Sequence, residues 1–480
     1  MSNKYITYAI SIILLGLFIL LGALTNIMIS IVLVSMFVFS FCMIRFKVNI
    51  DTLILVAIFF APCAEVFKLI TGFADFKILQ ILWSIILCFL VIGKIMQKEY
   101  SIPNIGKDNI IYLLYIIVII SSAVFSSNYI VSIKELIQYI YLFIIMYVII
   151  LKSQNKLFID GVVKTIIISN IFFIGVCLIS FLLGKAIIPT ITLLLNGKVY
   201  VNFDLFKVQD LTSGVGSLNR IGGIFGLGPI GIANIVLIQS FFINYKIRNS
   251  FTFRERILYL LLFSGNVIII VLTYSRAGLI IFIILHGITL FGKNIKNNIL
   301  YIILGLCILA IFLISFPNVT ERLLETFNLE EASTKYHLVF WIAAIKLGFN
   351  RILTGIGLGM SKYSLANFAE YFRSFGIYKV NSVDMHNILL QVWAEQGIFG
   401  LLISVVMLFS PIISYVKFSI TKKTKEKTIY YFIIMAYVAT FLYNLTNNNF
   451  YIESFWIMLA LVYAGKHNSF QLSNTEQETR

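Results

Sequence analysis

The stretch ILYLLLFSGNVIIIVLTYSRAGLIIFIILHGITLFG, residues 257–292, consists of two long apolar runs on either side of a short polar turn. An apolar run of about 18 residues is long enough to cross the roughly 30 Å hydrocarbon core of a bilayer as a helix. The turn Thr273–Gly278 is so short that the two runs predict a tight hairpin of membrane-spanning helices. Arg276 lies at the tip of this hairpin.

Apolar runs of this kind recur along the whole chain. Of its 480 residues, 60% are apolar, 12% are charged and six are proline, which is far more apolar than a soluble globular domain. We therefore expect an all-α polytopic membrane protein with about 14 transmembrane helices. The expected spans are residues 6–24, 27–44, 52–70, 77–93, 109–125, 133–151, 162–183, 220–243, 257–274, 278–292, 299–316, 387–410, 429–445 and 450–465.

The chain has a net charge of +16, and its Lys and Arg residues lie in short connectors between apolar runs instead of in one patch. This distribution indicates how the chain crosses the membrane. Basic residues concentrate in cytoplasmic connectors. With the N-terminus in the cytoplasm, alternate connectors are basic, and the opposite connectors near residues 25, 71–76, 126–131 and 446–449 contain no Lys or Arg. Both termini are then cytoplasmic, and a nucleic-acid partner is not expected.

This topology predicts one membrane domain with two long extracytoplasmic loops, and long loops in compact proteins usually carry function. The second loop contains an apolar helix-like stretch, Tyr336–Phe349, that is too short to span and is expected to lie in the interface or to dip in from it. The parts are helices 1–7 over residues 1–183, the first loop over 184–219, helices 8–11 over 220–316, the second loop over 317–385, helices 12–14 over 386–465 and a cytoplasmic tail over 466–480, which looks solvated from Asn468.

Arg220 begins the glycine-rich stretch RIGGIFGLGPIG, residues 220–231, at the start of the eighth span. Glycine and proline weaken a helix, and irregular backbone at membrane depth is tolerated only beside protein or a wet cavity. We expect a polar cavity beneath Arg220, where Gly222 and Gly223 let the backbone approach a ligand. The alternative is close helix packing through small residues, with Arg220 reaching lipid phosphates.

Arg276 is expected to bind an anion. An unpaired arginine below the headgroups costs about 2.5 to 3.5 kcal/mol on insertion scales. The guanidinium group has five donors that suit phosphate oxygens, so Arg220 and Arg276 together could clamp a diphosphate without a metal. The alternative is a structural ion pair between Arg276 and Glu395 or Glu453.

His386 closes the second loop and begins the twelfth span in MHNILLQVWAEQGIFG, residues 385–400. A histidine beside the positive end of a helix dipole is biased toward the neutral form that a general base needs. The alternative is that it only satisfies backbone groups at the helix start. Glu395, as a paired or protonated carboxyl within the membrane, would support the site from below. Of the other histidines, His286 is expected to pack in the core, whereas the role of His337 stays open.

Taken together, these segments resemble the O-antigen polymerase and ligase superfamily of the Wzy and WaaL type. Its members share a glycine-rich segment after an arginine, a Ser-Arg-Gly/Ala element and a His-Asn element that closes a large outer loop. The matching residues are Arg220, Gly222 and Gly223, then Ser275–Gly278, then His386, Asn387, Glu395, Gly397 and Gly400. The chain departs from the family at Ile230, where members often have asparagine, and at His337, where an arginine often precedes the loop-helix tryptophan.

The resemblance implies a GT-C-type glycosyltransferase that uses no cofactor or metal and inverts the configuration at the transferred sugar. The donor would be an undecaprenyl-diphosphate-linked oligosaccharide at the extracytoplasmic face of the bacterial inner membrane. His386 would be the base, Arg276 and Arg220 would hold the diphosphate, and Ser275, Asn387 and the two glycines after Arg220 would contribute to substrate binding.

We expect a polymerase of repeat units for O-antigen, capsule or exopolysaccharide. The alternative within the same chemistry is a ligase that moves the glycan to another acceptor, and the alternative of another class is a polysaccharide flippase or secondary transporter. Transporters usually carry their charged residues near the midplane, whereas the candidates here cluster under long loops. Chain-length regulators and flippases are expected as protein partners, beside the lipid bilayer.

Overall fold

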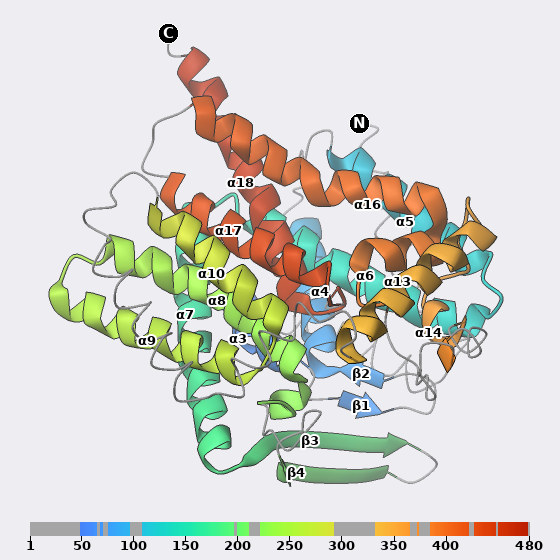
Figure 1. Ribbon diagram of the computed structural model, residues 1–480. Helices are drawn as coiled ribbons and strands as arrows, with labels where there is room; N and C mark the ends of the chain where they lie inside the picture. The colour runs from blue at the N-terminus through green and yellow to red at the C-terminus, as the bar shows by residue number, and fades with distance from the viewer. Residues whose placement is uncertain are drawn as a thin grey trace.

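The computed structural model describes residues 49–64, 68–70, 75–96, 108–195, 199–210, 221–291, 332–364, 372–373, 385–421, 427–447 and 450–478. These residues are mainly helical (Figure 1). The principal helices are α3 (Ile50–Phe60), α4 (Ile78–Met96), α5 (Asp108–Val124), α6 (Tyr129–Lys152), α7 (Lys156–Leu182), α8 (Pro229–Asn249), α9 (Phe253–Leu272), α10 (Arg276–Phe291), α13 (Ala332–Asn350), α14 (Ser361–Ser364), α16 (Ile388–Thr421), α17 (Lys427–Asn444) and α18 (Glu453–Glu478).

Five of the described helices are long and apolar enough to cross a membrane: α6, α7, α8, α9 and the Ile388–Val416 part of α16. Large apolar side chains are exposed along them, including Ile168 and Ile171 on α7 and Leu402 and Ile413 on α16. Such surfaces are stable against lipid rather than water. The chain is therefore a multi-pass membrane protein.

The count of fourteen spans stays a prediction. The predicted spans at 6–24, 27–44 and 299–316 lie outside the described residues. Several other predicted spans form apolar helices of 10–17 residues, shorter than a full crossing.

One predicted boundary is wrong. The third span was expected to reach residue 70, but α3 ends at Phe60 and a 3-10 turn, Ala61–Cys63, follows it. Pro62 lies in this turn and has no amide hydrogen with which to continue the helix. At the other end of the chain, the apolar part of α18 ends at Gly465, where the last span was predicted to end, and the helix continues through most of the predicted tail to Glu478.

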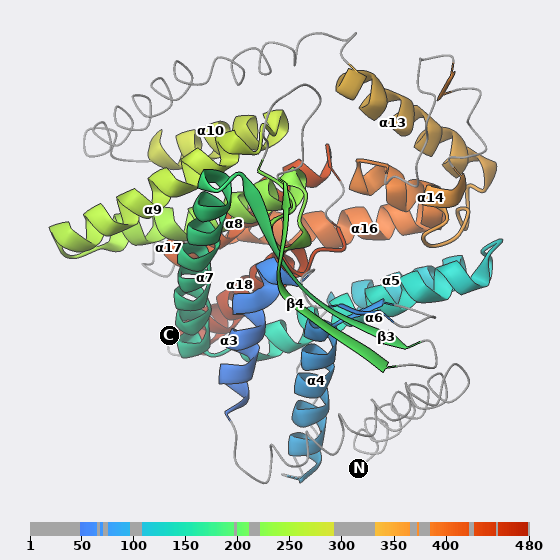
Figure 2. The ribbon, with the colours of Figure 1, turned by 90° about the horizontal axis from the view of Figure 1, so that it is seen from below.

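Two β-hairpins depart from the expected all-α fold. Strand β1 (Lys68–Ile70) pairs antiparallel with β2 (Asp75–Lys77), and β3 (Lys185–Leu195) pairs antiparallel with β4 (Val199–Asp210). The longer hairpin occupies most of the first predicted loop. Both hairpins lie on the same side of the helical part, at the bottom of Figure 1 and in front in Figure 2.

Connectors that the topology places on one side of the membrane contact one another. Lys77, at the end of β2, lies 3.4 Å from the Glu453 carboxylate at the start of α18. The Arg351 guanidinium donates to the Phe125 carbonyl in the α5–α6 turn over 2.9 Å. At the opposite end, an ion pair of 2.8 Å joins the start of α3 to the end of α6. Each of these contacts joins connectors that the prediction places on one side, whereas the separation of the two sets and the set that faces the cytoplasm stay predictions.

His286 in α10 is a packed core histidine, as predicted. Its side chain is buried and its ring stacks on Phe241 with centroids 4.1 Å apart. Its Nε2 lies 2.9 Å from the Ser240 hydroxyl and its Nδ1 lies 3.2 Å from the Asn244 amide nitrogen. Because neutral partners occupy both ring nitrogens, this histidine has a structural role.

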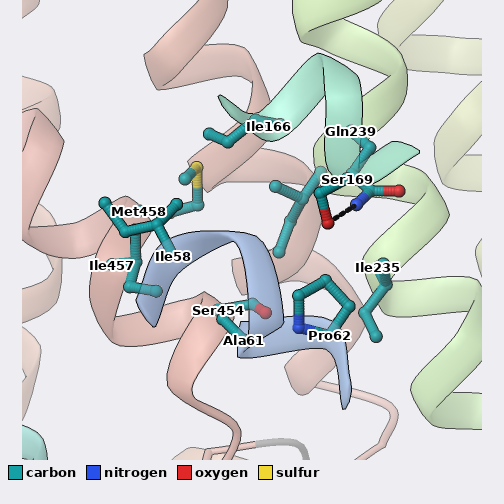
Figure 3. A pocket seen from close by; sticks show the side chains of 11 residues that line it. Ile58, Ala61, Pro62, Ile166, Ser169, Ile235, Gln239, Ser454, Ile457 and Met458 are labelled. Atoms are coloured by element: carbon teal, nitrogen blue, oxygen red, sulfur yellow. Dashed lines mark hydrogen bonds between the residues drawn. The ribbon is translucent and has the colours of Figure 1, made fainter. Parts of the chain in front are cut away.

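A small cavity lies between α3, α7, α8 and α18 (Figure 3). Its volume is about 30 Å³, enough for roughly one water molecule. Most of its lining is apolar, with Ser169, Gln239 and Ser454 as the polar side chains, and the Gln239 amide donates to the Ser169 hydroxyl over 3.5 Å. None of the predicted site residues lines this cavity, so it is not the predicted substrate site.

Candidate functional site

The glycine-rich segment is irregular, as predicted for the outer end of the eighth span. Arg220 lies outside the described residues. From Ile221 the backbone turns at Gly223, which has φ of 82° and donates its N–H to the Leu227 carbonyl over 2.8 Å. Helix α8 begins only at Pro229. Proline suits the first position of a helix, because an amide hydrogen there would have no acceptor within the helix.

The turn between α9 and α10 carries Ser275 as the cap of α10. The Ser275 hydroxyl accepts the Gly278 N–H over 3.3 Å, and its carbonyl accepts the Leu279 N–H over 2.9 Å. Arg276 is the first residue of α10 and is half-buried. Arg276 therefore stands at a helix start, and both a guanidinium group and a helix start attract anions.

The glycine-rich segment lies beside this turn. The Ile221 N–H donates to the carbonyl of Leu272, the last residue of α9, over 3.1 Å. Ile221 directly follows Arg220, and Leu272 lies four positions before Arg276. The structure therefore brings the first two predicted segments together.

Asn387 is the cap of α16. Its Oδ1 accepts the N–H groups of Leu389 and Leu390, both over 3.0 Å, and its Nδ2 donates to the Leu445 carbonyl over 2.8 Å. Its side chain thus starts the helix and ties it to the end of α17. His386 directly precedes this cap, at the predicted place but in a left-handed backbone conformation with φ of 51°.

The end of α17 joins the second and third segments. The Tyr443 hydroxyl lies 2.8 Å from the Ser275 hydroxyl, and two residues later the Leu445 carbonyl binds Asn387. Ser275 and Asn387 are each the sequence neighbour of a predicted catalytic residue. The end of α17 therefore holds the residues next to the candidate cation and the candidate base.

Three non-glycine residues in the described part of the chain have positive φ: Phe225, Tyr274 and His386, at 54°, 51° and 51°. One lies in each of the three segments. This conformation is uncommon for residues other than glycine, costs on the order of 1–3 kcal/mol, and clusters at functional sites. The presence of one such residue in each segment independently supports a shared role of the three segments.

Helix α13 brings two further side chains to His386. The rings of His337 and His386 meet edge to face, with centroids 4.8 Å apart and planes at 64°. The Trp341 indole N–H donates to the His386 carbonyl over 3.4 Å, and the Phe340 ring lies 5.8 Å from the His386 ring. The structure thus places His337, whose role the sequence left open, beside the candidate base.

Glu395 is fully buried in α16, one turn beyond Gln391. Its Oε1 accepts the Ser361 hydroxyl over 2.5 Å and the Gln391 amide over 3.2 Å. Glu453, the other acid considered for Arg276, accepts the Tyr141 hydroxyl over 3.1 Å and lies beside Lys77. The partners of Glu395 are thus Ser361 and Gln391, and those of Glu453 are Tyr141 and Lys77.

Sequence reasoning missed the end of α17. A signal was present, because the run Asn444–Asn449 contains four asparagines between two apolar helices. It also missed residues 351–361, where Gly355, Gly357 and Gly359 alternate with apolar residues in the second loop.

Residues 258–405 match a protein family described as O-Antigen ligase. The matched range includes the Ser275–Gly278 turn, α13 and the first turns of α16, and it covers less than half of the chain. The glycine-rich segment lies outside it. The comparison with curated proteins found no match. The family match supports the resemblance to the O-antigen polymerase and ligase superfamily.

Replacing Asn387 by alanine removes both cap bonds of α16 and the bond to Leu445. We expect Asn387→Ala to lower the free energy of unfolding by about 1–2 kcal/mol. Thermal unfolding of the purified protein in detergent measures this change. Asn387→Asp keeps the cap acceptor and loses only the amide donor, so it should cost less. Equal stability of Asn387→Ala and wild type would contradict the capping role.

Proposed function

We propose that the chain is a membrane-embedded polymerase that extends undecaprenyl-diphosphate-linked oligosaccharide repeat units. In this proposal the reaction takes place at the extracytoplasmic face of the inner membrane and needs no metal ion. The protein would have the GT-C type of architecture, with two long loops over the site. The O-antigen family match over residues 258–405 supports the reaction class.

The observation that carries the proposal is the attachment of two segments to one turn of α17. Tyr443 binds Ser275 and the Leu445 carbonyl binds Asn387. A transferase that uses a diphosphate leaving group needs a cation at the leaving group and a base at the acceptor, held in fixed relation. Arg276 and His386 adjoin the two attached residues and supply these two groups.

In the proposed step, the acceptor hydroxyl oxygen attacks the anomeric carbon of the donor glycan. The bond from this carbon to the phosphate oxygen breaks on the opposite side, and undecaprenyl diphosphate leaves with the electron pair. His386 accepts the proton of the acceptor hydroxyl. Because attack and departure occur on opposite faces, the configuration at the anomeric carbon inverts.

Arg276 stabilises the charge that grows on the departing diphosphate. The first-turn amides of α10 act in the same direction, since helix starts attract phosphate oxygens. Arg220 completes the clamp in this proposal, because its neighbour Ile221 binds the last residue of α9. Gly222 and Gly223 leave room for the lipid-linked substrate beside this backbone.

His337 has a supporting role in the proposed site. Its ring meets the His386 ring edge to face, and the Trp341 indole N–H donates to the His386 carbonyl. These contacts orient the imidazole of the base. A fixed orientation lowers the entropy that must be lost when the acceptor hydroxyl reaches the base.

A ligase is the second candidate, and the printed description of the matching family, O-Antigen ligase, favours it. It would use the same donor, the same base and the same diphosphate clamp. Only the acceptor differs, being a separate lipid, wall polymer or protein instead of another repeat unit. Chain-length regulators and flippases are proposed partners under the polymerase function.

Replacing the proposed base tests the mechanism. We expect His386→Ala to lower the rate of glycan elongation by about 10² to 10⁴-fold, the usual contribution of a general base. The assay follows elongation of an undecaprenyl-diphosphate repeat unit by purified protein, with chelator present and without nucleotide sugar. His467→Ala, in the C-terminal part of α18, is the matched control. Full activity of folded His386→Ala would exclude the base assignment.

Two substitutions of Arg276 separate the effect of its positive charge from the effect of its planar donor geometry. We expect Arg276→Ala to lower the rate by about 10² to 10³-fold, as the loss of one charge-stabilising donor does. Arg276→Lys keeps the charge without the planar fork of donors and should recover part of the rate. Arg254→Ala, exposed at the start of α9, should keep the wild-type rate. Equal rates for Arg276→Ala and wild type would contradict the diphosphate clamp.

The products distinguish a polymerase from a ligase. A strain that lacks a polymerase should accumulate single, unextended repeat units on the lipid carrier. A strain that lacks a ligase should accumulate long chains that remain on the carrier. Gel analysis of carrier-linked glycans from a deletion strain measures this difference, and we expect single units.

A further inference from the structure

Helix α16 is broken at its third turn, where the second loop crosses it. Gly397 has φ of 70° and ψ of −163°, far from helical values. The neighbouring backbone groups bind residues of the loop instead of their own helix. The Ile398 N–H donates to the Ile352 carbonyl over 2.7 Å, and the Ile356 N–H donates to the Ala394 carbonyl over 2.9 Å.

The Glu395 carbonyl is the centre of this crossing. It accepts the Gly357 N–H over 3.1 Å and the Ser122 hydroxyl of α5 over 2.7 Å. Glycine is required on both sides of the contact. A Cβ atom at Gly355 would overlap the Glu395 carbonyl, and one at Gly397 would lie 2.5 Å from the Ile352 oxygen.

The Glu395 side chain also binds the same loop. Its buried carboxylate accepts the hydroxyl of Ser361, the first residue of α14, over 2.5 Å. Ser361 is also fully buried. Between Gly357 and Ser361 the loop is also held to α6, because the Ser132 hydroxyl donates to the Leu358 carbonyl over 2.8 Å. The backbone and side chain of Glu395, together with backbone groups of Ala394 and Ile398, therefore hold residues 352–361, and we call these contacts the clasp.

The clasp lies at the far end of α13 from the histidine pair. Helix α13 runs in the same direction as the first part of α16, and the two lie side by side in Figures 1 and 2. Trp341 contacts His386, and further along Trp393 donates to the Ile345 carbonyl over 3.2 Å. From His337 to the end of α13 is about 20 Å at 1.5 Å per residue. A shift at the clasp therefore moves His337 and Trp341 relative to the base.

We propose that Glu395 is a positioning residue, which clasps residues 352–361 across the break in α16 and so holds His337 and Trp341 of α13 against His386. The kinetic consequence rests on the proposed function. A base displaced by about 1 Å loses on the order of 10²-fold in rate. Loss of the clasp should therefore lower kcat and leave the KM for the lipid-linked donor nearly unchanged.

The test combines kinetics with hydrogen exchange of the full-length protein in detergent. In Glu395→Ala we expect kcat to fall by about 10 to 100-fold, and the amides of Ile356, Gly357 and Ile398 to exchange faster. Glu395→Gln keeps an acceptor oxygen for Ser361 and should restore both properties. Ser414→Ala, also on α16, loses only a bond to the Ser410 carbonyl within the helix and should match wild type in both.

Unchanged exchange at these amides in Glu395→Ala would overturn the clasp, whatever the activity. Unchanged kcat with faster exchange would overturn its role in positioning. Ser361→Ala, which loses the hydroxyl bound to the carboxylate, carries the same test if Glu395→Ala does not fold. Exchange needs no substrate, so absence of glycosyl transfer by wild type would count against the proposed function alone and leave the clasp testable.

Discussion

Backbone polar groups that are removed from water need partners within the protein, and this constraint organises the candidate site. A helix in lipid satisfies its own N–H and C=O groups, so every break in a helix must be satisfied by another segment. At the breaks described here, backbone N–H groups bind carbonyl groups of other segments. Ile221 binds the end of α9, and Ile398 binds the loop at Ile352. The irregular parts of the chain therefore hold together instead of facing lipid.

This mutual satisfaction explains how a site can form from segments far apart in sequence. The Ser275–Arg276 turn and the Asn387 cap are separated by more than a hundred residues and are joined through the end of α17. The left-handed conformations of Phe225, Tyr274 and His386 occur where these segments turn. Backbone strain of this kind persists only where surrounding contacts enforce it. The bonds to α17 and α13 are such contacts.

Much of the helical framework could be predicted from the sequence, because apolar runs and basic connectors report directly on membrane crossing. The irregular start of α8 followed from its glycines and Pro229, and the start of α16 followed from His386 and Asn387. The family match over residues 258–405 agrees with the resemblance that these motifs suggested. Arg220 lies outside the described residues, and its role stays a prediction.

Other features depend on partners that no local pattern names. The break at Gly397 is stable only because residues 352–357 supply its hydrogen bonds, and nothing beside Gly397 in the sequence indicates that loop. The position of His337 follows from the packing of α13 on α16 in the same way. The β3–β4 hairpin is different, since Val201-Asn202-Phe203-Asp204 alternates apolar and polar residues in the manner of a strand. That signal was present and was overlooked.

The attachment of two segments to one turn of α17 also bears on how the protein responds to its bilayer. Membranes differ in thickness, and helices tilt to match them. A tilt of α17 carries the Ser275 hydroxyl and the Asn387 amide together, because both are bonded to residues two positions apart. The spacing between Ser275 and Asn387 is then set by the end of one helix and not by the surrounding lipid. Such a site can keep its geometry in bilayers of different composition.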